Sequence, residues 1–215
     1  MRIDEIILFS THIENQKHFY KYTLGLEQLI DSPNEISFKV GASVLTFRYK
    51  NEMKPSHVAF NIPSGAINDA ELWLKKRLTI IPSGDGNITN FESWKAQAIY
   101  FYDADQNIME FIARDLVEAK KEALFSVSSL LSISEMAIAT NDIETIYNSI
   151  NELKHIPIFD GDFSRFCALG NHDGLFILID NTKKKWYPTN DQVFTSEFII
   201  KGDYNFSFIN GAIES

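Results

Sequence analysis

The feature that most constrains the fold is a strand opening that occurs three times along the 215 residues. The openings start at Glu5, His57 and Glu135, each of which has a side chain that can bind a metal. In each opening a large apolar residue follows three positions on, a polar or capping residue seven positions on, and then a helix-like stretch. The spacing exceeds the roughly 20 to 47 residues of a solenoid repeat. The sequence therefore predicts a duplicated unit that begins with a strand and a helix.

Unit one is predicted to contain a strand, a helix and a β-hairpin. Residues 6–9 have β-type side chains, and residues 14–22 place aromatic side chains at spacings compatible with one helical face. Two β-type runs at residues 35–40 and 43–49 are separated by a Gly-Ala pair, which is typical of a hairpin. Residues 28–31 are predicted as a further strand of the same unit.

Units two and three repeat this order, with a helix followed by a hairpin. The helices are predicted at residues 66–76 and 142–154, and the hairpin strands at residues 98–102, 108–113, 166–169 and 175–179. Beyond them lie two more strand candidates, at residues 193–200 and 204–209, without an opening strand and helix of their own.

These elements predict an α+β fold built from repeated βαβββ units. We expect units one and two, residues 1–115, to pair as a half-barrel cup, and residues 116–132 to form a helical connector. Residues 133–215 then hold unit three and a tail that we interpret as a truncated fourth unit. Because this tail is too small to cover the whole sheet face of unit three, the remaining apolar surface predicts a homodimer.

The composition is that of a globular protein, with 45% hydrophobic and 13% aromatic residues. Asp and Glu number 29 against 20 Lys and Arg, and the net charge of −9 opposes binding to nucleic acid or anionic lipid. A single cysteine, Cys167, excludes an intrachain disulfide, and the charged start of the chain lacks the apolar run of a signal peptide. We therefore expect a cytoplasmic protein whose partner is a small molecule.

Three side chains are candidates for one metal site. If units one and two pack as related copies, Glu5 and His57 occupy equivalent places near their shared axis. The corresponding hairpin-strand positions are Val44, Glu110 and Ile177, so only unit two carries a carboxylate there. Glu5, His57 and Glu110 would provide one nitrogen and two oxygen donors, a set that suits a divalent metal with open positions. Since Ile177 cannot bind metal, no second centre is expected in unit three.

The order and spacing of four segments resemble the vicinal oxygen chelate superfamily. These segments are residues 5–8, 24–26, 57–60 and 102–111, with Phe19-Tyr20 between the first two, and the resemblance covers residues 3–115 well and unit three more loosely. The superfamily includes glyoxalase I, extradiol dioxygenases, fosfomycin-resistance thiol transferases and bleomycin-resistance proteins. It implies a cup of paired βαβββ units around a small-molecule site.

The resemblance also implies a role for each candidate ligand. The first-strand ligand of the superfamily falls on Glu5, its second-unit ligand on His57 and its last hairpin ligand on Glu110. Three-ligand members usually have His where this chain has Glu5, which departs from the two-His, one-carboxylate set of non-haem iron. The fourth ligand of glyoxalase I falls on Val44, which cannot bind metal and disfavours that reaction.

Two functions remain open at this point. The first is a divalent-metal-dependent enzyme in which Mn²⁺, Mg²⁺, Fe²⁺ or Zn²⁺ polarises an oxygen of a small organic substrate. Replacing His by Glu favours the harder ions over Zn²⁺. The alternative is a metal-free protein that binds or sequesters a small molecule, as bleomycin-resistance proteins do. The sequence identifies no catalytic residue and no organic cofactor.

Overall fold

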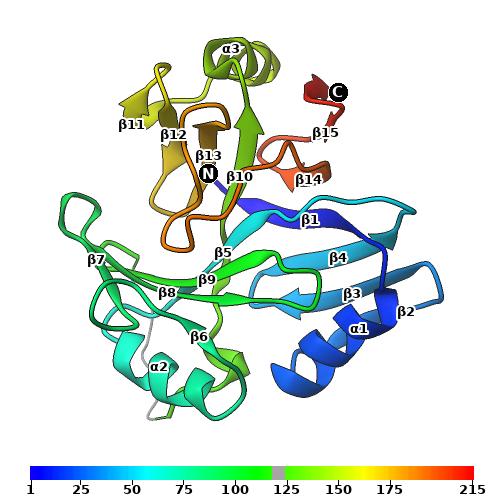
Figure 1. The fold of residues 1–215 in the computed structure, drawn as a ribbon, viewed down its shortest axis with the longest axis vertical. Coiled ribbons are helices and arrows are strands. Elements are labelled where there is room, and N and C mark those ends of the chain that lie inside the picture. Colours follow the sequence, from blue (N-terminus) through cyan, green and yellow to red (C-terminus); the bar gives the residue numbers. More distant parts are fainter. Residues whose placement is uncertain (118–123) are drawn as a thin grey trace.

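The described residues, 1–117 and 124–215 of a computed structural model, form two curved sheets (Figure 1). The first sheet has the strand order β16 (Ala212–Glu214), β15 (Phe206–Ile209), β14 (Phe198–Gly202), β1 (Ile3–Ser10), β4 (Ser43–Tyr49), β3 (Glu35–Val40) and β2 (Gln28–Asp31). The second has the order β11 (Ile158–Asp162), β12 (Phe166–Asn171), β13 (Gly174–Asp180), β10 (Ser132–Thr140), β5 (His57–Ile62), β9 (Ile108–Arg114), β8 (Ala96–Tyr102) and β6 (Ile80–Ile81), with β7 (Thr89–Phe91) also on β8. The predicted α+β class with open, curled sheets is confirmed.

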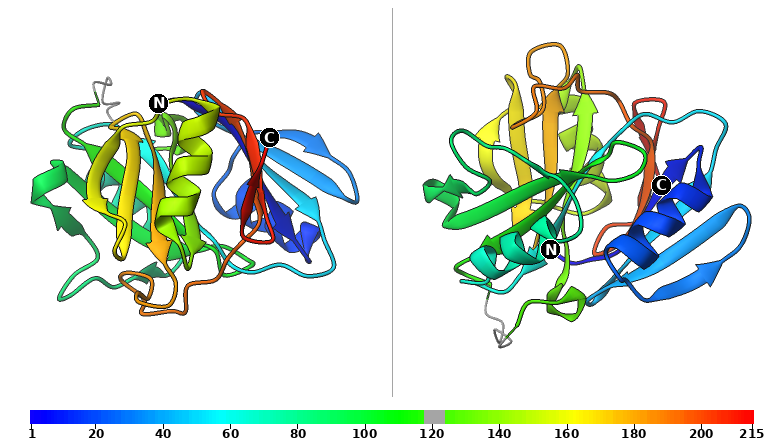
Figure 2. Two further views of the ribbon diagram at one scale, coloured as in Figure 1. Left: turned by 90° about the horizontal axis from the view of Figure 1, so that it is seen from above. Right: turned by 60° about the horizontal axis from the view of Figure 1, so that its bottom comes forward.

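Helices cover the sheets where the sequence predicts them. They are α1 (Ile13–Lys17), continued by a π-helix (His18–Thr23), α2 (Ile67–Lys75), α3 (Ile143–Leu153) and 3₁₀ turns at Glu92–Trp94 and Val127–Ser129. In α3 the Asp142 side chain caps the first turn by accepting a hydrogen bond from the backbone N–H of Thr145 (3.0 Å). Figure 2 shows α3 between the second sheet and the C-terminal strands. No described helix is long and apolar enough to cross a membrane.

In each of the three segments that share the opening, the first strand lies parallel to the last strand of the hairpin. The pairs are β1 with β4, β5 with β9 and β10 with β13. The opening residues accordingly face hairpin positions on the neighbouring strand, Glu5 opposite Val44, His57 opposite Ile108 and Glu135 opposite Leu175.

The expected pairing of units one and two does not occur. Strand β5 pairs antiparallel with β10, so unit two shares its sheet with unit three. Strand β1 pairs antiparallel with β14, so the C-terminal tail completes the sheet of unit one. The repeat identifies equivalent strands but does not specify which copies become neighbours. Because unit three has a full partner, the reason for expecting a homodimer is also absent.

The expected helical connector at residues 116–132 falls partly on residues 118–123, outside the described residues. The described remainder contains only the short 3₁₀ turn Val127–Ser129, with Ser126 and Ser129 forming a capping box.

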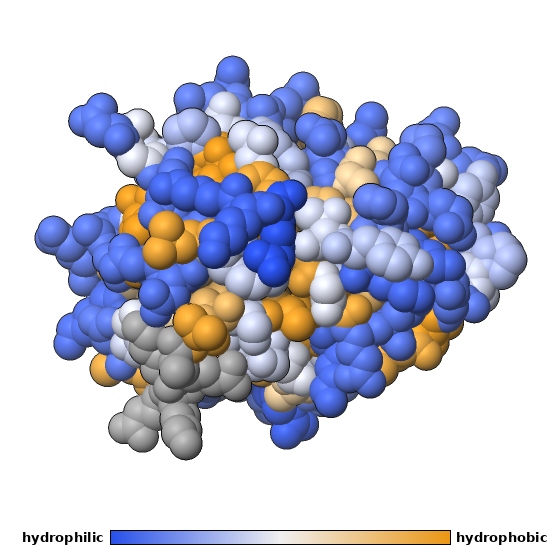
Figure 3. All heavy atoms as spheres, turned by 90° about the horizontal axis from the view of Figure 1, so that it is seen from below, coloured by the Kyte–Doolittle hydropathy of each residue, from blue (hydrophilic) through white to orange (hydrophobic). Residues whose placement is uncertain are grey.

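One hydrophobic core joins the two sheets. It includes Ile6, Phe38 and Phe47 of the first sheet and Phe60 and Phe111 of the second, all buried. The surface that carries α1 and α2 is mostly hydrophilic, with apolar side chains in separate small groups (Figure 3). Apolar burial between the sheets therefore contributes to holding their arrangement.

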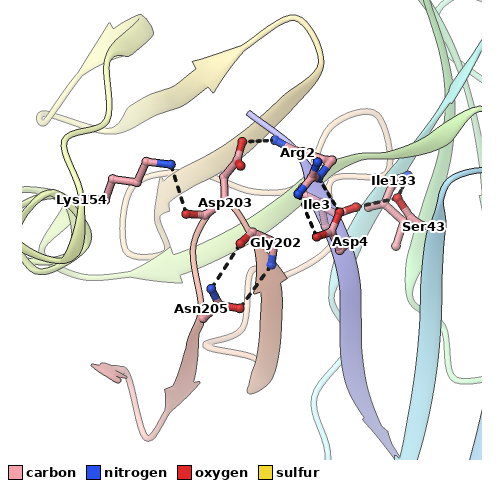
Figure 4. A network of polar contacts seen from close by, with 9 residues as sticks. All are labelled: Arg2, Ile3, Asp4, Ser43, Ile133, Lys154, Gly202, Asp203 and Asn205. Carbon is pink, nitrogen blue, oxygen red and sulfur yellow. Dashed lines mark hydrogen bonds and ion pairs between the residues drawn. The ribbon is translucent and has the colours of Figure 1, made fainter.

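Polar contacts fix the junction between the sheets. Ser43 Oγ donates to the carbonyl of Ile3 and accepts from the backbone N–H of Ile133 (3.0 Å), which ties the first sheet to β10 (Figure 4). Next to it, the backbone N–H of Ala42 donates to the carbonyl of Leu131 (2.8 Å). These bonds require close approach of the β3–β4 turn to the segment before β10.

A buried carboxylate makes a second junction. Asp103, in the turn between β8 and β9, accepts hydrogen bonds from Gln16 Nε2 (2.9 Å) and Tyr20 OH (3.0 Å) on the helical segment of unit one. Asn107 Nδ2 donates to the same carboxylate (2.8 Å). Unit one is thus attached to unit two by hydrogen bonds although the two lie in different sheets.

Substituting Gly41 by Ala should destabilise the protein more than substituting Gly25 by Ala. Both glycines have positive φ (57° and 78°), which costs a non-glycine residue about 1–2 kcal/mol. A Cβ on Gly41 would in addition overlap the carbonyl of Leu131, whereas nothing lies within 4 Å of a Cβ on Gly25. We expect a loss of about 3 kcal/mol or more for Gly41→Ala in urea unfolding. Equal losses for the two variants would contradict the close junction.

Candidate functional site

Glu5 lies in the first sheet, apart from the other two predicted metal ligands. Its carboxylate accepts hydrogen bonds from Lys201 Nζ and Thr46 Oγ1, both at 2.7 Å. Burial opposes ionisation of Glu5, but these hydrogen bonds outweigh it and hold the pKa of the carboxyl below its usual value. Because unit one pairs with the tail, Glu5 faces Lys201 of β14, and the three predicted ligands do not converge.

His57 and Glu110 do come together, on the neighbouring strands β5 and β9. His57 Nε2 lies 2.9 Å from Glu110 Oε2, and both side chains are buried. The imidazole packs edge-on against Trp186 and Tyr100, with ring centroids 5.3 and 6.1 Å away. Among the described residues, His57 Nδ1 has no hydrogen-bond partner. The pair can therefore hold or transfer a proton at one ring nitrogen while the other is left for a further contact.

A third ionisable residue faces the same side of the second sheet. Glu110 and Glu135 stand on opposite sides of Ala59, each in register with it across β9, β5 and β10. The small side chain of Ala59 leaves space between the two carboxylates. Glu135 thus holds, relative to His57 and Glu110, the position that the sequence predicted for Glu5.

Arg114 neutralises Glu135. Its Nη2 is ion-paired with Glu135 Oε1, and the Arg114 side chain is fully buried. The indole of Trp94 covers the guanidinium, with 5.5 Å from Cζ to the ring centroid. Nε and Nη1 of Arg114 have no partner within the described part of the chain. A buried cation with two unpaired donors needs further acceptors.

His57, Glu110, Glu135 and Trp94 border a cavity of about 550 Å³ on the second sheet, which we call the second-sheet cup, and Arg114 lies buried beside it. Its size falls in the range of small-molecule sites. The aromatic lining residues are Phe91, Trp94, Tyr100, Phe166, Trp186 and Tyr187. The cavity also touches His57, Glu110 and Glu135, so aromatic walls surround a polar floor.

The irregular segment between β13 and β14 runs past this cup. Trp186 and Tyr187 of this segment both line the cavity, and Tyr187 packs edge-on against Tyr100 at 6.0 Å. Tyr102 OH donates to Asp191 Oδ2, which anchors the segment to β8. The tail therefore completes the first sheet and the segment leading to it forms part of the cup wall.

The donors in this arrangement do not form a metal site. Within the described chain, no group of three or more His, Cys, Asp or Glu side chains is placed to hold a metal ion. His57 and Glu110 supply two donors, and the third carboxylate, Glu135, is bound by Arg114. Catalytic zinc sites use three protein ligands, one more than His57 and Glu110 supply.

Part of this cluster was recognisable in the sequence. The repeated opening makes Glu135 equivalent to Glu5. The sequence nevertheless predicts no metal role for Glu135, because Ile177 lacks a donor. Glu110 and Arg114 are four residues apart on one strand and so share a face by the two-residue period. What the sequence did not indicate was that unit three would supply the neighbour of β5.

Replacing Glu135 by Gln should change how stability depends on pH. Burial raises the pKa of Glu135 from 4.5 to about 7, with Arg114 acting in the opposite direction. Between these values the folded protein binds the proton more tightly than the unfolded chain, so its free energy of unfolding should fall as pH rises. Urea unfolding from pH 4.5 to 7 should show this fall in the wild type and a weaker one in Glu135→Gln.

Asp180→Asn is the control for loss of a carboxylate. Hydrogen bonds from Lys183 and Thr182 lower the pKa of Asp180 from 3.8 to about 2. The contribution of Asp180 to the free energy of unfolding therefore changes with pH only below the measured range of pH 4.5 to 7. A slope that changes equally in both variants would contradict the assignment to Glu135.

No protein-family model and no curated protein sequence matches the chain. Among solved structures, a proposed dioxygenase of Bacillus subtilis subsp. subtilis strain 168 superimposes with a TM-score of 0.61 at 15% identity, over 83% of this chain. The present chain spans 63% of the length of that protein.

Two smaller proteins also align. A lactoylglutathione lyase of Agrobacterium tumefaciens has a TM-score of 0.45 at 16% identity, over 52% of this chain and 92% of its own. A fosfomycin resistance protein of Listeria monocytogenes has a TM-score of 0.44 at 18% identity, over 54% and 95%. At 15% identity the likeness to the B. subtilis protein shows the fold alone. The chain therefore shares the fold of the B. subtilis protein.

Proposed function

We propose that the protein binds a small organic molecule in the second-sheet cup without a metal ion. The observation that carries this proposal is the cavity of about 550 Å³ whose floor is a buried cluster of ionisable side chains. A cavity with apolar walls and a few convergent polar groups is the usual form of a small-molecule site.

The walls favour a planar ligand. Trp94, Tyr100 and Trp186 present aromatic surface to the cavity from three separate chain segments. Offset or edge-on contacts with aromatic rings contribute beyond the area that they bury. A flat molecule enclosed by these rings would lose most of its contact with water.

The floor supplies polar contacts and a group that can exchange a proton. His57 lines the cavity and is held by Glu110 at 2.9 Å. A carboxylate in this position orients the ring and fixes which nitrogen faces the ligand. The proposed role of His57 is to hydrogen-bond the ligand and, if the protein is an enzyme, to act as its acid or base.

A divalent-metal-dependent enzyme is the second candidate. The observation in its favour is that His57, Glu110 and Glu135 all line one cavity, with the two carboxylates on either side of Ala59. Glu135 would have to leave Arg114 to complete a three-donor set. Elemental analysis of protein purified without chelator separates the two candidates, because the second requires about one bound metal per chain.

Filling the cup should abolish ligand binding. We expect members of a library of small aromatic compounds, screened by thermal shift and tryptophan fluorescence, to bind the wild type. Replacing Ile177, which lines the cavity, by Trp should weaken the best compound at least tenfold, which is about 1.4 kcal/mol. Val44→Trp, in the first sheet and outside the lining of the cup, should leave its affinity unchanged. Absence of any binding compound, or binding that Ile177→Trp does not weaken, would contradict the proposal.

A further inference from the structure

The placement of Arg114 within the cup is set by the strand register. Arg114 stands opposite Ala96 on β8, while Glu110 stands opposite Tyr100, two inward-facing positions further along the same strand pair. Glu135 is level with Glu110 across Ala59. To reach Glu135, the Arg114 side chain must lie along the sheet, beneath the residues that line the cup.

This arrangement brings a fixed positive charge to a place where two carboxylates would otherwise repel. Glu110 and Glu135 are both buried and border the same cavity. Two carboxylates in such surroundings require a cation, a proton or a metal ion between or beside them. The Arg114 guanidinium supplies the cation from within the chain.

The same contact removes one donor from the floor. A guanidinium bound to a carboxylate neutralises its charge and repels an approaching metal ion, so the carboxylate becomes a poorer ligand. With Glu135 engaged, His57 and Glu110 are the remaining pair, and they bond each other. The packing of Trp94 over the guanidinium keeps Arg114 in this position.

We propose that Arg114 takes the place of a metal ion in the second-sheet cup. Its guanidinium neutralises Glu135 and keeps this carboxylate from joining His57 and Glu110 as a third ligand. This proposal rests on the proposed metal-independent function of the same cup. Arg114 is in this sense the residue that determines whether the site takes a metal. Its Nε and Nη1 have no partner among the described residues, so the guanidinium is held in place by Glu135 and Trp94.

Removing the guanidinium should convert the cup into a metal site. After dialysis against EDTA and then chelator-free buffer at pH 7.5, wild type and Arg114→Met would be titrated calorimetrically with ZnCl₂ and MnCl₂. We expect wild type to bind no ion with a Kd below about 1 mM, and Arg114→Met to bind at least one of the two about 100-fold more tightly, because three donors with a net negative charge are then free.

Two control variants identify the source of the new affinity. The double variant Arg114→Met with Glu135→Gln lacks both the guanidinium and the third carboxylate and should lose the gain. Arg114→Lys keeps a positive charge beside Glu135 and should not acquire tight metal binding. The proposal would be overturned if Arg114→Met gained no affinity for metal. It would also be overturned if the double variant gained as much affinity for metal as Arg114→Met alone.

A measurement on the wild type does not depend on whether the variants fold. The ring-proton NMR signals of His57 should be unaffected by stoichiometric Zn²⁺, because the two remaining donors do not bind it tightly. A stoichiometric shift of these signals would overturn the proposal. Failure of the proposed function gives a different result: aromatic compounds would then fail to bind the cup while the Arg114→Met variant still gained metal affinity.

Discussion

The antiparallel pairing of β5 with β10 is the constraint on which the rest of the site depends. It places unit two beside unit three, sets Ala59 opposite Glu135, and so brings Glu135 level with Glu110 on the other side of the same strand. Were β5 instead to pair with β1, Glu5 would be the carboxylate facing His57. In the structure β1 pairs with β14, and Glu5 faces Lys201. One choice of strand neighbour thus decides which carboxylates share a cavity and which become ordinary ion pairs.

Burial then gives the cluster its chemical character. Glu5 in the first sheet is half-buried, and its carboxyl keeps a pKa below its usual value because its hydrogen bonds outweigh desolvation. Glu135, buried in the second sheet, has its pKa raised even though Arg114 is ion-paired with it. The same residue type at equivalent places of two units therefore has opposite shifts. The difference comes from solvent access, since Glu135 is buried and Glu5 is only half-buried.

The sequence predicted the local elements well and the site only in part. Strands at residues 28–31, 35–40 and 43–49 were predicted with the bounds that the structure has, because hydrophobic alternation and the hairpin glycine are local signals. The sequence predicted His57 and Glu110 as two ligands of one metal, and the structure places them 2.9 Å apart on the parallel strands β5 and β9. Glu5 failed as their partner because the choice between units is a long-range event that no local pattern encodes. Arg114 was overlooked for the same reason, as its partner Glu135 lies 21 residues away in another unit.

The contact between Arg114 and Glu135 joins unit two to unit three inside the cup, and its coupling energy tests this account most directly. A double-mutant cycle with Arg114→Met, Glu135→Gln and the double variant, measured by urea unfolding at pH 7.5, isolates the interaction between the two side chains. The account predicts a coupling of about 1–3 kcal/mol, because each single variant leaves a buried polar group without its partner. Additivity of the two substitutions to within about 0.3 kcal/mol would mean that the two residues do not interact, and would contradict the pairing of these units around a shared cup.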